Sequence, residues 1–283
     1  MITIILSEDN AVRLHLLLES LHLNGGNLFD ITVLYRASSD EFFKGYEKAA
    51  IHFNGKNRYS HTFPVRWIEM EHSSVAKNVL SLLSSARDLV CIFNDENILF
   101  KNPPSFTAIK TLFDEHNPLA LSLRLGNNTI IQNPYNADEY FSEIPPEGEF
   151  VLDQFLVWDA ASVAPYTNFG IPFSINGHIY KNRSLAKILD QSSSSRIDDL
   201  ESEIQPIFYN NLYDELPSAL SCLEYSIAIH NSSQKIADTD QQPLGLGLED
   251  LNKRYLQSQT IDLDYIPFEH ISMPFEHFVL KFH

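Results

Sequence analysis

The chain has 283 residues, 44% of them hydrophobic, and a formal net charge of −17 at pH 7. The hydrophobic fraction predicts a sizeable core, and the length fits one large α/β domain or one domain with a substantial appendage. Phosphate neutralisation needs clustered lysine and arginine, so the acidic balance argues against a nucleic-acid partner. It leaves room for a nucleotide ligand, because one metal ion and one or two basic residues can offset a diphosphate.

The cysteines and the first residues predict the cellular compartment in which the protein resides. Cys91 and Cys222 lie in apolar stretches, and two cysteines in a chain of this length are not a disulfide framework, which predicts a reducing compartment. The opening "MITIILSEDN" turns acidic after five apolar residues, too early for a signal peptide. No run approaches the ~18 apolar residues of a membrane span. We therefore expect a cytoplasmic protein without a transmembrane segment.

The first hundred residues alternate between short apolar runs and helical patterns. "ITIIL" and "ITVLY" are β-branched runs suited to buried strands, and "FPVRWIEM" and "DLVCIF" predict two more. The first helix follows "SEDN", with Val12, Leu16, Leu17 and Leu21 on one face. Ser38 and Glu41 have the spacing of a capping box for the second helix, and "SSVAKNVLSLLSSA" predicts the third.

This alternation predicts right-handed βαβ units in a parallel sheet. In such sheets, ligands bind at the carboxyl ends of the strands. The polar residues just beyond three of those ends are Ser7-Glu8, Tyr35-Arg36 and Asn94 to Asn97, and we expect them to converge on one crevice. No G-x-G-x-x-G follows the first strand and no P-loop pattern is present, which argues against a classical dinucleotide site and against a P-loop.

The stretch "CIFNDENILF" carries adjacent carboxylates inside an apolar run. Mg²⁺ and Mn²⁺ take one or two protein carboxylates and complete their octahedron with water and phosphate oxygens. The i, i+2 spacing places Asp95 and Asn97 on one side of an extended chain, whereas Glu96 points the other way unless the backbone turns. The alternative is that these side chains only make turn hydrogen bonds at a strand end.

The second half of the chain is more irregular. "LALSLRLG" and "FLVWDAA" predict strands, with a long loop rich in Asn, Pro and acids between them. "SLAKILDQ" and "IDDLESEIQPIF" are helical, "LPSALSCLEYSIAIHNSSQKI" holds another strand, and "GLEDLNKRYLQSQTIDL" a last helix. We expect a single domain over residues 1–283, in which 1–102 form a nucleotide-binding half and 103–283 an acceptor-binding half with the C-terminal helices.

Several segments in this order resemble GT-A glycosyltransferases, whose nucleotide-sugar half ends in a D-x-D metal motif after the fourth strand. "VLYRASSDEFFKGYE" is similar to the second strand and helix of bacterial, phage and viral members, and "NFGIPFSINGHIYKN" to their mid-chain "G-Y-P-x-S-x-D-G-H-I-Y-R" stretch. "SCLEYSIAIHNSSQKIADT" and "LEDLNKRYLQSQTIDL" resemble a C-terminal block of the family. Asn97 and Asn176 depart from it, since each stands where an Asp is usual.

The resemblance implies a GT-A fold and transfer of a sugar from a UDP-, GDP- or dTDP-sugar to a glycan or lipid-linked acceptor. The leaving diphosphate needs charge neutralisation, which Mn²⁺ or Mg²⁺ supplies as a Lewis acid. We assign that ion to Asp95, Glu96 and Asn97. The expected donor-binding residues are Ser7, Glu8, Tyr35, Arg36, Lys77 and Asn94.

Each donor-binding residue also has a structural alternative. Tyr35 is expected to stack on the base, or else to form a surface pair with Arg36. Lys77 is expected to reach a phosphate or the base, or else to be a solvated helix lysine. Asn94 is expected to contact ribose or sugar hydroxyls, or else to cap the backbone.

If the reaction inverts configuration, the acceptor hydroxyl needs a general base. The candidates are Asp153, Asp159 and His178, all after the metal strand. Asp159 has the alternative of capping the next turn, and His178 that of a structural hydrogen bond.

Two other functions stay open. A glycosyltransferase-like protein that binds nucleotide sugar or glycan without turnover is compatible with the Asn97 and Asn176 replacements. A nucleotidyltransferase shares the α/β half and acidic metal site, but "LSEDNAVR" lacks the glycine-rich, basic loop usual after its first strand.

Overall fold

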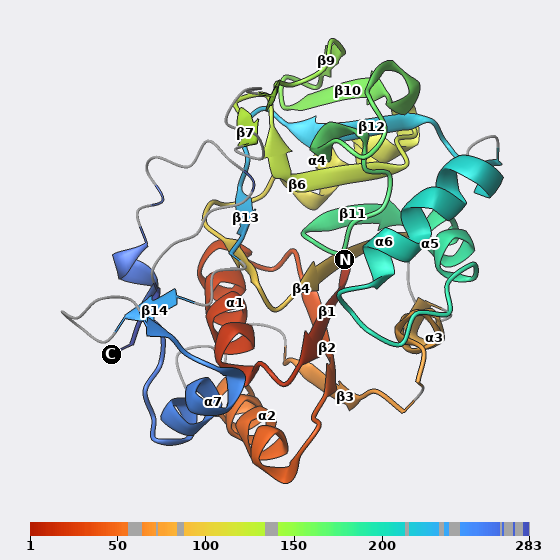
Figure 1. Cartoon of the computed structure of the whole chain (residues 1–283). Helices are drawn as coiled ribbons and strands as arrows, with labels where there is room; N and C mark the ends of the chain where they lie inside the picture. The colour runs from red at the N-terminus through yellow and green to blue at the C-terminus, as the bar shows by residue number, and fades with distance from the viewer. Residues whose placement is uncertain are drawn as a thin grey trace.

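The computed structural model describes residues 1–55, 64–71, 73–83, 88–133, 141–212, 215–231, 235–237, 244–266, 268, 274 and 280–282. Its centre is a nine-stranded sheet in the order β3-β2-β1-β4-β11-β6-β12-β10-β9, with helices on both faces (Figure 1). The predicted α/β class is confirmed. A single sheet runs through both halves of the chain.

The first four strands are parallel, as predicted. They are β1 (Ile2–Glu8), β2 (Asp30–Arg36), β3 (Arg66–Glu69) and β4 (Leu89–Asn94). β1 pairs with both β2 and β4, so Leu6 lies level with Leu34 on one side and with Asn94 on the other. The carboxyl ends of β1, β2 and β4 therefore lie at one edge of the sheet.

The second half extends the sheet with mixed directions. β11 (His178–Lys181) runs antiparallel between β4 and β6 (Ala120–Gly126). Beyond β6 come β12 (Ala219–Leu223), β10 (Phe155–Asp159) and β9 (Glu149–Val151). Short pairs outside this sheet are β5 (Asn97–Leu99) with β13 (Ala228–His230), and β7 (Ile131–Asn133) with β8 (Phe141–Glu143). β14 (Lys235–Ala237) lies between β15 (Leu244–Gly245) and β16 (Leu280–Lys281).

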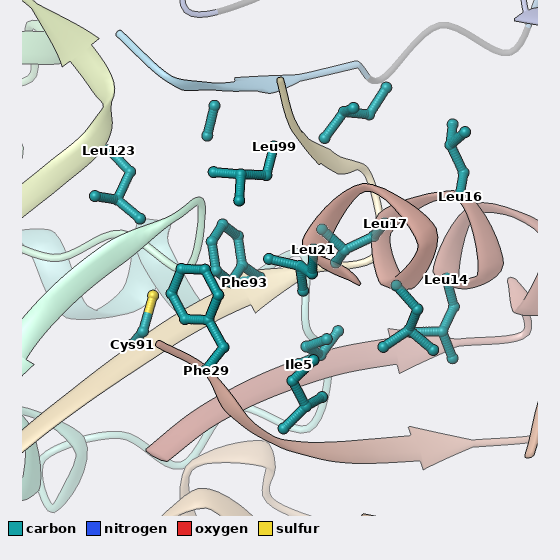
Figure 2. Packing of buried hydrophobic residues seen from close by; sticks show 14 of the residues in the cluster. Ile5, Leu14, Leu16, Leu17, Leu21, Phe29, Cys91, Phe93, Leu99 and Leu123 are labelled. Atoms are coloured by element: carbon teal, nitrogen blue, oxygen red, sulfur yellow. The ribbon is translucent and has the colours of Figure 1, made fainter. Parts of the chain in front are cut away.

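Two apolar cores lie on the two faces of the sheet. One is built with α1 (Ala11–Asn24), α2 (Asp40–Asn54), α4 (Phe106–Glu115) and α7 (Leu248–Leu256). Figure 2 shows part of it, where Leu14, Leu17 and Leu21 of α1 lie over Ile5 and Phe93. The other is built with α3 (Val75–Leu83), α5 (Asn182–Leu189) and α6 (Leu200–Ile207).

The helices mostly begin where the sequence predicts. In α1 the expected face of Val12, Leu16, Leu17 and Leu21 is buried. The capping box at Ser38 is wrong, because Ser39 is the N-cap of α2 and its side chain accepts a hydrogen bond from the Phe42 N–H.

The structure also shows the state of the cysteines and the character of the helices in the described part of the chain. Cys91 and Cys222 are buried free thiols. Within the described residues, no helix has the length and apolar character needed to cross a bilayer.

Candidate functional site

A pocket of about 380 Å³ lies at the carboxyl ends of β1 and β4. Its lining has two parts. The strand wall comes from β1, the start of α1 and the turn after β4, and consists of Leu6, Glu8, Asp9, Asn10, Arg13, Asn94, Asp95 and Glu96. The loop wall comes from two distant segments and consists of Arg196, Ile197, Asp198, Leu246, Gly247, Leu248 and Leu251.

A sharp turn carries the chain from β1 into α1. Asp9 has a φ of 56°, a left-handed conformation that Asp tolerates better than most residues. The turn is pinned to the end of β2, since the Asp9 N–H donates to the Arg36 carbonyl at 3.1 Å and Asp9 Oδ1 accepts from the Ser38 N–H at 2.7 Å. The first turn of α1 is thereby held over the strand ends, with Asn10 and Arg13 lining the pocket.

Asp95 is a buried carboxyl group held by a chain of hydroxyls. Ser7 Oγ donates to Asp95 Oδ2 at 2.6 Å and contacts the Tyr46 hydroxyl at 2.8 Å, which accepts from the Asn10 N–H at 3.0 Å. Burial raises the pKa of Asp95 to about 8; the Ser7 hydrogen bond opposes this shift and the Glu96 charge adds to it. Without a cation, the proton stays on this carboxyl group at neutral pH.

Glu96 is fixed through both carboxylate oxygens. Arg13 Nη1 lies 2.7 Å from Oε1, and His230 Nε2 lies 3.3 Å from Oε2. The same Arg13 nitrogen donates to the Asn231 carbonyl at 2.7 Å. Burial raises the pKa of Glu96, whereas the Arg13 guanidinium lowers it. Arg13 is only 3% exposed, whereas the Glu96 side chain is 28% exposed, so the ion pair is buried at its arginine end and reaches the pocket at its carboxylate end.

The backbone does turn between β4 and β5, which decides where the acidic cluster points. Glu96 N–H donates to Asn94 Oδ1 at 3.2 Å, and Asn94 N–H donates to Asn97 Oδ1 at 3.1 Å. Asn97 Nδ2 donates to Asn176 Oδ1 at 3.2 Å, and Asn176 Nδ2 donates to Glu201 at 2.9 Å. Asn97 is 1% exposed and does not line the pocket, so the turn directs Asp95 and Glu96 outward and Asn97 inward.

The loop wall is held by contacts from the first half of the chain. Arg36 Nη1 donates to the Ser195 carbonyl at 2.7 Å, and the Val75 N–H donates to the Ser194 carbonyl at 2.8 Å. Asp198 lies close enough to raise the pKa of both Asp95 and Glu96 through its charge. Arg36 thus contributes to the pocket by positioning residues 196–198.

The charged lining of the pocket and the carboxyl group of Asp95 decide whether the expected metal ion fits this site. Five carboxyl groups and two guanidinium groups line it; even with Asp95 protonated the acidic groups outnumber the basic ones, so a bare diphosphate would be repelled. Within the part of the chain that the structure describes, no three His, Cys, Asp or Glu side chains form a metal cage. Mg²⁺ and Mn²⁺ need only one or two carboxylates when a diphosphate supplies other ligands. The residues fit such an ion held from Asp95, with Glu96 beside it.

The structure brings together four of the residues expected to bind donor or metal, namely Glu8, Asn94, Asp95 and Glu96. Ser7 lies directly behind Asp95. Tyr35 and Lys77 do not line the pocket: the Tyr35 ring packs on Tyr46, with ring centroids 4.6 Å apart, and Lys77 is exposed on α3.

The three candidates for a general base lie outside the pocket lining. Asp153 is exposed in the β9–β10 turn with a φ of 53°. Asp159 is exposed and accepts from the Ala161 N–H at 3.0 Å, capping a 3₁₀ turn, Ala160–Ser162. His178 is buried in β11, where burial and the Arg124 charge lower its pKa to about 3, so it is neutral.

Other pocket residues were not anticipated. Arg13 left a local signal, since it is a charged residue within the apolar run "AVRLHLLL" and sits on a buried part of the helix. Asp9 and Asn10 follow the predicted strand directly. No short sequence pattern indicates the loop wall. Segments 196–198 and 246–251 are distant from the strands in the sequence and reach the strand ends only when the chain folds.

No protein-family model matches the chain, and no curated protein matches it either. Among solved structures, it is similar to residues 1–349 of TarS from S. aureus in complex with UDP, at 16% identity and a TM-score of 0.48 over 82% of this chain and 60% of that one. It is also similar to 4-diphosphocytidyl-2C-methyl-D-erythritol synthase from Anaerococcus prevotii, at 11% identity and a TM-score of 0.40 over 91% of this chain and 98% of that one. The chain thus spans less than two thirds of the TarS fragment.

Proposed function

We propose that the protein is a metal-dependent glycosyltransferase of GT-A type that moves a sugar from a UDP-, GDP- or dTDP-sugar to a hydroxyl of a glycan or lipid-linked acceptor. The observation that carries the proposal is the pocket at the carboxyl ends of β1 and β4, where Asp95 and Glu96 face open space and Arg13 lies behind them. Ligands of open parallel sheets bind at this edge.

Asp95 is the proposed ligand of Mn²⁺ or Mg²⁺. When bound, the ion supplies a Lewis acid that neutralises the charge developing on the leaving diphosphate. Ser7 donates to Asp95 Oδ2 at 2.6 Å, which leaves Oδ1 without this hydrogen bond. If the ion binds, Asp95 and the neighbouring Glu96 would hold it as carboxylates, and its charge would offset that of the diphosphate in this acidic pocket.

We propose that Glu96 accepts a hydrogen bond from a hydroxyl group of the sugar nucleotide. Its two oxygens are fixed by Arg13 and His230, so little conformational freedom is lost when a ligand binds. Fixed polar groups of this kind stabilise a developing charge better than mobile ones.

Asp198 is the proposed general base. It lines the pocket and its charge reaches Asp95 and Glu96, whereas Asp153, Asp159 and His178 do not line the pocket. The side chain of Asp198 is exposed and lies 3.2 Å from Arg196, a surface pair that an arriving acceptor can break at small cost.

Calorimetry with UDP-, GDP- and dTDP-sugars, with and without Mn²⁺, tests the function. Binding that requires the metal, together with metal-dependent hydrolysis or transfer of one donor, supports the enzyme. Binding without turnover with any acceptor would leave only a binding protein. For the base, Asp198→Asn should remove transfer but keep donor affinity, because a base acts in the transition state. Asp199→Asn is the matched control, since Asp199 is adjacent and exposed but does not line the pocket.

A further inference from the structure

Gly247 is a glycine that the protein's own structure does not require. It is the N-cap of α7, with φ −68° and ψ 163°, a conformation open to any residue. In the described part of the chain, a Cβ built there would meet only Glu249 Oε2, at 3.4 Å, an ordinary contact distance. Neither backbone strain nor a neighbouring atom excludes a side chain at this position.

The other glycines with defined surroundings behave differently. Gly177 has a φ of 71°, and Gly26 has a φ of 54°, where a side chain is strained. At Gly148 a Cβ would lie 2.4 Å from the Val157 carbonyl oxygen, and at Gly126 2.3 Å from the Ser226 nitrogen. These glycines are required by strain or close contacts, whereas Gly247 has only its N-cap position, which Asn, Asp or Ser fills at least as well, so the pocket offers a further reason for a glycine there.

The position of Gly247 supplies that reason. It lines the pocket between Leu246 and Leu248, and Leu251 and Ile197 add further apolar surface to the same loop wall. A side chain at 247 would extend towards the pocket, because among the described residues only Glu249 Oε2 lies within 4 Å of a Cβ built there. Bare backbone flanked by leucines is a surface on which a flat, uncharged ring can lie closely.

We infer that Gly247 sets the size of the pocket, and that an uncharged ring of the ligand lies directly on its backbone. The inference rests on the proposed function, in which that ring is either the base or the sugar of the donor. The charged part of the ligand then faces the strand wall, where Asp95, Glu96 and Arg13 lie.

A substitution ladder at this position tests the inference. Gly247→Ala, Gly247→Asn and Gly247→Val add volume in steps, and Asn is among the best N-cap residues, so Gly247→Asn keeps α7 formed while it fills the pocket. Glu249→Val is the matched control, because Glu249 is exposed in the same helical turn and does not line the pocket. Thermal unfolding without ligand checks that each variant is folded.

The ligands are the donor sugar nucleotide, its nucleoside diphosphate and the free sugar, each titrated calorimetrically with Mn²⁺. We expect Gly247→Asn and Gly247→Val to weaken binding of the complete donor at least about tenfold, the usual effect of one misplaced group in a shaped pocket, while Glu249→Val binds normally. An equal loss for the nucleoside diphosphate places the base on Gly247, and a loss confined to the sugar nucleotide places the sugar there.

Unchanged donor binding by folded Gly247→Asn and Gly247→Val would overturn the assignment of Gly247 and leave the proposed function standing. If the wild-type protein binds none of the sugar nucleotides or diphosphates, the proposed function fails, and the assignment fails with it.

Discussion

The two walls of the pocket differ in how firmly their side chains are held. On the strand wall, Arg13 is 3% and Asp95 8% exposed, and hydrogen bonds from Ser7, His230 and the backbone fix the acidic groups. On the loop wall, Leu248 is 40% exposed and the side chain of Arg196 65%. The groups assigned to the metal and the diphosphate thus lie on the rigid wall, and those assigned to ligand shape on the open one. Binding of the metal and the diphosphate is thus assigned to the strand wall, and donor shape together with the proposed base Asp198 to the loop wall.

The largest expected effect is on metal-dependent donor binding, and it should differ between the two walls. Asp95→Ala should weaken metal-dependent donor binding by about 100-fold or more, because the proposed ion loses its protein carboxylate. Asp198→Ala, on the loop wall, should leave donor affinity within about threefold, since it contributes mainly to the transition state. Titration with Mn²⁺ at fixed sugar nucleotide measures both. Equal Mn²⁺ dependence in Asp95→Ala and wild type would mean that the strand wall does not hold the ion.

A second comparison concerns stability. Arg13→Met should lower the free energy of unfolding by about 1–3 kcal/mol, because the partly exposed Glu96 carboxylate and the Asn231 carbonyl lose a charged hydrogen-bond donor. Arg196→Met removes an exposed arginine and should cost less than about 1 kcal/mol. Urea unfolding of both variants gives the comparison. In Arg13→Met/Glu96→Gln, much of the loss should be recovered; similar costs for the two arginine variants would show that the walls do not differ in rigidity.

A substitution of Asn97 tests whether the strand wall contributes any ligand for the ion beyond Glu96. Asn97→Asp should not tighten the cation, because the side chain at 97 points away from the pocket. Its new carboxylate would face Asn176 Oδ1, now 3.2 Å from Asn97 Nδ2, and should cost about 1–3 kcal/mol of stability. Asn27→Asp adds the same charge at an exposed position and serves as control. A lower Mn²⁺ midpoint in Asn97→Asp would instead place residue 97 at the ion.

A further comparison, of stability against pH, concerns a residue outside both walls. Burial lowers the pKa of His178 to about 3 from 6.5, so the neutral form stabilises the fold above pH 6.5, and this contribution is lost as the pH falls from 6.5 towards 3. The slope is at most about 1.4 kcal/mol per pH unit. His178→Asn keeps a donor for the Asn176 carbonyl and should flatten the decline in stability between pH 6.5 and 4. An unchanged pH profile would assign the acid sensitivity to other groups.

The sequence predicted the strand wall better than the loop wall, for a physical reason. Glu8 and Asn94 to Glu96 directly follow apolar, β-branched runs, so their place at the strand ends follows from local pattern. The Asn97 side chain does not point in the predicted direction, because the turn between β4 and β5 breaks the alternation of side chains that an extended chain would have.

The loop wall depends on long-range packing, which no short pattern records. The antiparallel insertion of β11 beside β4 brings the second half of the chain to the strand ends. Arg36 illustrates the same limit: its place after β2 was predicted, but its partner, the Ser195 carbonyl, lies 159 residues further along the chain.

The packing of α7 has a consequence for synthesis on the ribosome. α7 lies against α2, where Asn252 Nδ2 donates to the Glu41 carbonyl at 2.7 Å and Lys48 reaches the Tyr255 carbonyl (Figure 1). Because chains emerge amino end first, α2 is made long before the helix that covers it. Until residues 246–256 leave the exit tunnel, the nascent protein has its acidic groups in place but lacks part of the opposite wall and exposes apolar surface to chaperones. The proposed donor pocket and the cover over α2 are therefore completed together, late in translation.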